Sequence, residues 1–183
     1  MKKMVAAAAL LLVAIVAAYV AYPYATAYLL REALAAGDQA ELVRLIDFPR
    51  VRAGLKRDLP ALVRSKMIRE SEGWFAQFGA EIAIGLSPDM LARRIDLKMT
   101  PASVIDLVVA PGAKAGRERD PTAIRAELQR KLRTMGFVAP AIFEIEFGEP
   151  NDPPAKWVTL RLTIDDLTWR VTRIIPPGAP RGR

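Results

Sequence analysis

An unbroken apolar stretch opens the chain. Met4–Tyr22 contains no charge and no proline, and Lys2 and Lys3 lie just before it. A helix of about 20 apolar residues crosses a hydrocarbon core of about 30 Å, so this stretch is long enough to span a membrane. The two lysines favour a cytoplasmic N-terminus, which places the rest of the chain on the opposite side of the membrane.

Two interpretations of this stretch stay open. Small residues in Ala25-Thr26-Ala27 allow a signal peptidase to cut before Tyr28. However, Tyr24–Ala36 has a helical pattern, with Pro23 near its first turn and Gly37 just past its end, and cleavage would divide that helix. We therefore expect an uncleaved signal-anchor over residues 1–30, with a cleaved signal peptide and a secreted or periplasmic domain as the alternative.

The apolar spacing is helical from residue 31 to about residue 134. Asp38 and Glu41 have the spacing of a capping box, which predicts a short helix. Pro49 then begins a longer amphipathic helix, in which Pro60 is expected to produce a bend or a break.

Three later helix starts share one pattern. A capping side chain precedes a proline at the first helical position in Ser87-Pro88, Thr100-Pro101 and Asp120-Pro121. The helix that begins at Pro121 is expected to end at Gly136.

The pattern changes to alternation near the C-terminus. Apolar and polar residues alternate in Ala141–Phe147, Trp157–Ile164 and Leu167–Ile175, which is typical of strands with one buried face. Asp165-Asp166 is expected to form the turn between the last two strands. In the last strand, Leu167, Trp169 and Val171 are expected to face inward.

Helices followed by a short sheet predict an α+β fold. We expect one domain over residues 31–175, in which a helical part packs on a three-stranded antiparallel sheet, and a disordered tail over residues 176–183. Across the strands, Arg161 or Arg170 is expected to pair with Glu144 or Glu146.

The composition narrows the chemistry. The chain has no cysteine and no histidine, which excludes disulfides, thiol catalysis and histidine-based triads and argues against a zinc site. We expect no enzyme activity, no catalytic residues, no metal and no cofactor. An exported carboxylate-dependent hydrolase stays as the alternative, because a pair of acids alone can carry out glycoside hydrolysis.

Basic residues suggest a first candidate surface. The net charge is +7, and cations are dense between residues 44 and 69. Opposite an apolar row they form a face that can lie on anionic lipid, although a solvated helix face explains the same pattern. The candidate residues are Arg50, Arg52, Lys56, Arg57, Arg64 and Lys66. Nucleic acid is not expected as a partner, because the chain has no recognised binding motif.

The apolar face of the sheet is a second candidate. If the covering helices leave a space, this face lines a pocket for an apolar ligand, and otherwise it is an ordinary filled core. Its residues are Phe143, Ile145, Phe147, Leu160, Leu162 and Trp169. Asp47 is interpreted as a helix cap before Pro49, with Phe48 in the core, rather than as a partner of Arg52 at a pocket rim.

Several short motifs lie along the chain. They are Tyr22-Pro23, Gly37-Asp38, Asp47-Phe48-Pro49 followed by Arg52, Leu55 and Lys56, and Trp169 in the final strand. Together they resemble a bacterial family, domain-of-unknown-function family 2939, over nearly the whole chain. The resemblance implies an envelope-associated bacterial protein and assigns no activity. Helices before a curved sheet are also similar to the cone-like NTF2-type fold, an analogy that carries no function.

These observations lead to one functional hypothesis. We expect a non-enzymatic binding or scaffolding domain, anchored by a single span in the bacterial inner membrane and facing the periplasm. Its expected partners are a lipid-like apolar ligand or an anionic membrane surface.

Overall fold

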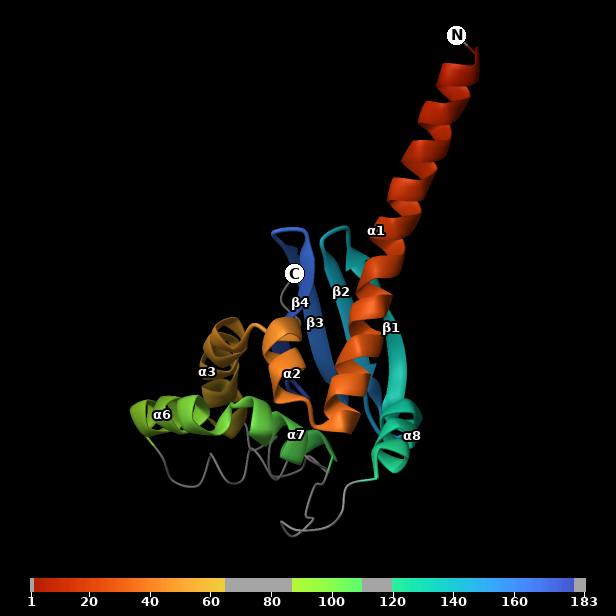
Figure 1. Ribbon diagram of the computed structural model, residues 1–183. Helices are drawn as coiled ribbons and strands as arrows, with labels where there is room; N and C mark the ends of the chain where they lie inside the picture. The colour runs from red at the N-terminus through yellow and green to blue at the C-terminus, as the bar shows by residue number, and fades with distance from the viewer. Residues whose placement is uncertain (1, 65–86, 110–119, 180–183) are drawn as a thin grey trace.

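The computed structural model describes residues 2–64, 87–109 and 120–179, and its architecture is α+β (Figure 1). The described helices are α1 (Lys2–Ala36), α2 (Gln39–Leu45), α3 (Phe48–Arg64), α6 (Pro88–Lys98), α7 (Pro101–Val109) and α8 (Pro121–Lys131). The strands are β1 (Leu132–Ala139), β2 (Ile142–Phe147), β3 (Val158–Asp165) and β4 (Thr168–Ile175), with a short 3-10 helix, η1 (Pro154–Lys156), before β3. Each strand pairs antiparallel with the next, so the sheet has the order β1-β2-β3-β4.

The sheet has four strands, whereas the sequence predicts three. The helix predicted from Pro121 to Gly136 ends at Lys131, and the chain continues directly as β1. No helix-breaking residue lies between Lys131 and Gly136, so the local sequence does not indicate that the helix ends at Lys131. Phe137 of β1 pairs with Phe143 of β2, and this cross-strand contact outweighs the local helical spacing.

The first helix is longer than the sequence predicts. α1 joins the apolar stretch and the helix predicted over Tyr24–Ala36 into one element, with Pro23 inside it. Leu30 and Leu34 of α1 are both buried in the core. The boundary predicted between residues 30 and 31 therefore falls within one helix, and residues on both sides of it belong to one core.

The helix ends follow most of the predicted signals. Ser87, Thr100 and Asp120 each accept a hydrogen bond from a backbone N–H in the first turn of α6, α7 and α8. Gly37, with a φ of 70°, ends α1 in the left-handed conformation that favours glycine. The break expected at Pro60 is absent, because α3 continues through it to its last residue.

The sheet positions the core. α1 crosses one face of the sheet, α2 lies between α1 and α3, and α3 packs on β4 (Figure 1). Among the most deeply buried side chains on this face are Phe143, Leu162, Trp169 and Val171. The inward orientation predicted for Trp169 and Val171 is confirmed.

Leu167 does not face inward as predicted. It forms the two-residue β3–β4 turn together with Asp166, and both residues have positive φ, 60° and 46°. The turn therefore begins one residue later than the sequence predicts. As a result, the Leu167 side chain projects from the end of the hairpin and is 84% exposed.

A predicted cross-strand ion pair forms between Arg161 and Glu144. Arg161 of β3 lies opposite Glu144 of β2, and its Nη2 is 2.7 Å from Glu144 Oε1. Arg170 makes a different contact, because it donates to the backbone carbonyls of Val43 and Arg44 near the end of α2. A cation there satisfies carbonyls that lack a helical partner.

Part of the predicted disordered tail is ordered. Pro176 is buried, and the backbone N–H of Gly178 donates to the carbonyl of Ala155 in η1 over 2.9 Å. Residues 176–179 therefore pack on the domain, while residues 180–183 lie outside the described residues.

Candidate functional site

A cavity of about 200 Å³ lies between α1 and the apolar face of the sheet. The sheet contributes Leu132, Met135, Ile145, Phe147, Val158, Leu160, Val171 and Ile174. Of the predicted pocket residues, Ile145, Phe147 and Leu160 line this cavity. Phe143, Leu162 and Trp169 are instead fully buried in the core beside it. The cavity is therefore on the face that the sequence indicates, but it occupies only part of that face.

The sequence of α1 explains why a space remains. Tyr24, Ala27 and Tyr28 of α1 line the cavity, and Ala27 is the smallest of them. Its methyl group fills less space than the side chains of Leu30 and Leu34, which line the same cavity and are buried in the core. The space is thus left where α1 carries a small residue opposite large, well-paired strand residues.

The rim of the cavity is partly exposed and mostly apolar. Tyr24, Tyr28 and Met135 are exposed, so the cavity opens between α1 and β1. Such rings and thioethers cover apolar ligands well, because they combine a large apolar surface with adaptable shape.

Polar groups gather at the α8 side of the cavity. Arg31, Gln129 and Lys131 line this part, and Arg31 Nη1 donates to Gln129 Oε1 over 3.3 Å. Glu32 is shared by Arg31 at 3.2 Å and by Arg125 at 2.7 Å, which ties α1 to α8. The charged rim is thus held in place by contacts between the two helices.

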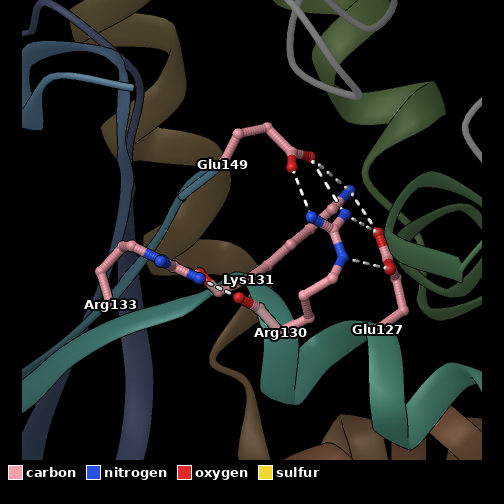
Figure 2. Close-up of polar contacts among 5 residues, drawn as sticks. All are labelled: Glu127, Arg130, Lys131, Arg133 and Glu149. Atoms are coloured by element: carbon pink, nitrogen blue, oxygen red, sulfur yellow. Dashed lines mark hydrogen bonds and ion pairs between the residues drawn. The ribbon is translucent and has the colours of Figure 1, made fainter. Parts of the chain in front are cut away.

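A compact ion cluster fixes the end of α8 (Figure 2). Arg130 contacts Glu127 and Glu149, each at 2.7 Å, and Lys131 contacts the same two carboxylates at 3.1 and 3.4 Å. Hydrogen bonding from Arg130, with a smaller contribution from Lys131, lowers the pKa of Glu127 to about 2. Hydrogen bonding from Arg130 also lowers the pKa of Glu149. Both carboxylates therefore stay charged at neutral pH, and Lys131 is held beside the cavity.

Arg133 lies beside this cluster and contacts backbone carbonyls in place of a carboxylate. It donates to the backbone carbonyls of Arg130 and Lys131 at the end of α8 (Figure 2). A guanidinium group in this position satisfies the last helical carbonyls and the negative end of the helix dipole. The abrupt change from α8 to β1 is stabilised in this way.

Two of the predicted basic residues, Arg50 and Lys56, are paired with carboxylates. Arg50 contacts Asp47 at 3.4 Å and Asp165 at 2.6 Å, and Lys56 contacts Asp96 at 2.7 Å. Each of these cations therefore has its own carboxylate partner, which reduces the charge that it offers to a lipid surface.

The other predicted basic residues lie in different surroundings. Arg52 donates to the carbonyl of Met99 over 3.1 Å and lies over the ring of Phe48. Arg57 is largely exposed, 3.6 Å from Asp58. Arg64 is the last residue of α3, and Lys66 lies outside the described residues.

Asp47 caps a helix, as the sequence predicts. Its Oδ1 accepts a hydrogen bond from the backbone N–H of Arg50 over 3.0 Å, and Phe48 is buried. The backbone N–H of Asp47 also donates to Val171 of β4. Arg52 does not pair with it, so this stretch connects helices and supplies no rim to the cavity.

The part of the chain that the structure describes gives little support to a hydrolase that relies on carboxylates. No described residue that lines the cavity is an aspartate or a glutamate, and the described residues hold no cluster of acids able to bind a metal ion. Asp165 and Asp166 lie at the β3–β4 turn, away from the cavity lining.

Some cavity residues are missed by the sequence patterns. Tyr24, Ala27 and Tyr28 belong to a segment interpreted as anchor or signal, and Gln129 and Lys131 resemble ordinary surface residues. One signal was available, since all four tyrosines of the chain fall within residues 19–28. Tyrosine is enriched at the interface between membrane and water, so this cluster marks where an apolar helix meets a polar environment.

Comparison with known proteins identifies a family. A family model described as a protein of unknown function, DUF2939, matches residues 12–107, just over half of the 183 residues, so the chain belongs to this family. The match includes the Tyr22-Pro23, Gly37-Asp38 and Asp47–Lys56 motifs, whereas Trp169 and the whole sheet follow it. The predicted resemblance is confirmed, over a shorter stretch than expected. No curated protein and no solved structure matches the chain, and the NTF2-type analogy stays a prediction.

Proposed function

We propose that this member of the DUF2939 family is a membrane-anchored, non-enzymatic binding protein. In this proposal α1 crosses a bilayer once, and the cavity holds the apolar end of a lipid-like ligand. The observation that carries the proposal is the cavity itself, whose walls are almost entirely apolar and which is built in part by the same helix that serves as the anchor.

The N-terminal part of α1 supports the anchor. It is long and apolar enough to cross a membrane, and the apolar part is exposed. Cleavage before Tyr28 would remove Tyr24, whose ring lies edge-on to Phe143 at 4.8 Å, and would separate Pro23 and Thr26 from the core. These contacts favour an anchor that remains attached. Lys2 and Lys3 favour a cytoplasmic N-terminus, and with the bacterial resemblance this gives an inner-membrane protein with a periplasmic domain.

The size of the cavity limits the ligand. A dry apolar cavity of roughly 150 Å³ accommodates benzene, so about 200 Å³ accommodates one end of an acyl or polyprenyl chain and not a whole lipid. The remainder of the ligand would leave between Tyr28 and Met135. Arg31 and Lys131 near this opening already have carboxylate partners, so they make the opening polar and leave the recognition of the ligand to its apolar end.

Lipid analysis of the full-length protein tests this proposal. The protein is extracted with its anchor into detergent, analysed by native mass spectrometry, and then extracted with organic solvent. We expect a reproducible apolar adduct in the wild type. A clean apo mass, with no lipid enriched over the detergent extract of a membrane without the protein, would contradict the proposal.

Two matched substitutions connect the adduct to the cavity. Ala27→Phe fills the space from α1, whereas Ala126→Phe places the same ring on the exposed surface of α8. We expect Ala27→Phe to remove most of the bound ligand and Ala126→Phe to leave it. Ala27→Leu gives a smaller obstruction and an intermediate loss, which separates occlusion from misfolding. Equal ligand in all three variants would show that the adduct binds elsewhere.

A further inference from the structure

We infer that the two β-hairpin turns beside α1 lie in the head-group region of the bilayer that α1 crosses, with Leu167 inserted among the lipids. The turns are the β1–β2 turn, residues 139–142, and the β3–β4 turn, residues 165–168. The inference rests on the membrane anchor of the proposed function and is independent of whether the cavity holds a ligand.

The first argument is depth along α1. Met4–Tyr22 is 19 residues, which at about 1.5 Å per residue is close to the hydrocarbon thickness of about 30 Å. Tyr19, near the end of this run, donates its hydroxyl hydrogen bond to the carbonyl of Pro140 in the β1–β2 turn. Its ring also lies 6.1 Å from Phe137 and 6.0 Å from Trp169. The domain therefore begins at the depth where the membrane span ends.

Both turns lie at the same end of the sheet. Figure 1 shows the β1–β2 and β3–β4 turns at the end where the free part of α1 leaves the domain. A bilayer around that part of α1 would meet the two turns first. The opposite end of the sheet, with α8 and η1, would face away from the membrane.

The second argument is the chemistry of the β3–β4 turn. Leu167 is 84% exposed, and its φ of 60° is unfavourable for a residue with a side chain. Two-residue turns of this type favour asparagine or glycine. Here the chain carries a large apolar residue that lies outside the hydrophobic core of the described domain and costs backbone energy. Burial in lipid gives that residue a favourable environment.

The charges around Leu167 set how deep the turn reaches. Asp165 is neutralised by Arg50 at 2.6 Å, while Asp166 is exposed beside Leu167. Arg170, on the next strand, is turned to the carbonyls at the end of α2. The exposed Asp166 carboxylate suits the hydrated head-group layer and opposes entry into the hydrocarbon core.

The β1–β2 turn has matching chemistry. Residues 134–143 carry no charge, although a turn at the surface of a domain in water is usually polar. Val138, Pro140 and Ala141 are exposed in this stretch. Tyr19 and Tyr22 lie within one turn of each other on α1 at this level, as expected of an aromatic belt at a membrane interface.

Site-directed spin labelling tests the inference directly, because the chain has no cysteine to remove. The full-length variants Leu167→Cys, Ala141→Cys, Leu97→Cys and Val13→Cys are labelled with a nitroxide and reconstituted into vesicles of phosphatidylethanolamine and phosphatidylglycerol. Collisions of each label with oxygen and with a water-soluble nickel chelate then report its depth. Leu97 is the matched control, since it is an exposed leucine of α6, 76% exposed.

We expect the labels at 167 and 141 to meet the nickel chelate several-fold less often than the label at 97, and oxygen more often. The label at 13 should report the hydrocarbon core. If 13 lies in lipid while either 167 or 141 behaves like 97, the inference is wrong and the anchor stands. If 13 itself behaves like 97, the anchor fails and the inference fails with it.

Discussion

Asp58 of α3 and Arg173 of β4 form a forked ion pair inside the protein. Arg173 Nη2 lies 3.0 Å from Asp58 Oδ1 and 2.8 Å from Oδ2, and Arg173 Nε lies 3.2 Å from Oδ2. The Asp58 side chain is only 6% exposed. The pair holds α3 on the sheet with charges that have little access to water, so each charge depends on the other.

Removing one partner of this pair should be costly. Asp58→Ala leaves the Arg173 guanidinium buried without its carboxylate, and we expect the free energy of unfolding to fall by about 3 kcal/mol. Chemical denaturation of the full chain in detergent, followed by tryptophan fluorescence, measures this. Arg57→Ala is the control, because Arg57 is exposed and 3.6 Å from the same carboxylate, and its loss should cost below about 1 kcal/mol. Equal losses in the two variants would contradict this assignment.

Two glycines should respond in opposite ways to alanine. A Cβ on Gly148 would lie 2.2 Å from Cδ1 of Trp157, whose indole N–H donates to the carbonyl of Asp152 over 2.9 Å. Gly148→Ala must displace the ring, and we expect a loss of about 1–3 kcal/mol in the free energy of unfolding.

Gly136 is the matched control for that substitution. A Cβ at Gly136 meets no atom within 4 Å, so Gly136→Ala should leave stability unchanged or raise it by up to about 1 kcal/mol. Thermal unfolding of both variants in the same detergent provides the comparison. Coincident midpoints for the two variants would show that Trp157 is not constrained as described.

Features that depend on a few consecutive residues are predicted correctly from the sequence, whereas features that depend on distant residues are missed. The caps at Ser87, Thr100 and Asp120 are predicted correctly because a cap involves a few consecutive residues. Strand alternation likewise predicts that Arg161 or Arg170 pairs with Glu144 or Glu146, and the Arg161–Glu144 pair forms. β1 is missed because its formation depends on pairing with β2, and the local residues are compatible with a helix.

The candidate site is less accessible to sequence reasoning. Alternation identifies the apolar face of the sheet, but it contains no information on how closely α1 approaches that face. The cavity depends on Ala27 meeting large strand residues from more than a hundred positions away. Likewise, the basic pattern on α3 does not reveal that Arg50 pairs with Asp165 and that Lys56 pairs with Asp96.

The ion cluster at the end of α8 predicts a defined response to acid. The pKa of Glu127 in the folded protein is about 2, below its ordinary value of 4.5, because Arg130 donates hydrogen bonds to it. A lowered pKa stabilises the folded state fully above pH 4.5, and this contribution is lost as the pH falls from 4.5 toward 2. Glu149 responds in the same direction. Both side chains are partly exposed, so water screens the effect and the total remains below about 1 kcal/mol.

Arg130→Gln tests this response. The variant removes the main cause of both pKa shifts, and we expect its free energy of unfolding to fall less steeply than that of the wild type over the same pH range. Arg93→Gln, on the exposed surface of α6, serves as the control and should keep the wild-type slope. Parallel pH profiles for Arg130→Gln and the wild type would show that these contacts do not contribute.

The continuity of α1 also has a consequence for biosynthesis. α1 is made first, yet the strands that cover its buried face come from the last part of the chain, and Tyr19 is bonded to a residue 121 positions later. Contacts between residues this far apart in sequence form slowly. Leu30 and Leu34 therefore lack their sheet neighbours while most of the protein is translated. Until β4 emerges, every nascent chain therefore carries an apolar face of α1 that its sheet neighbours do not yet fully cover, and chains that stop before β4 keep part of that face exposed.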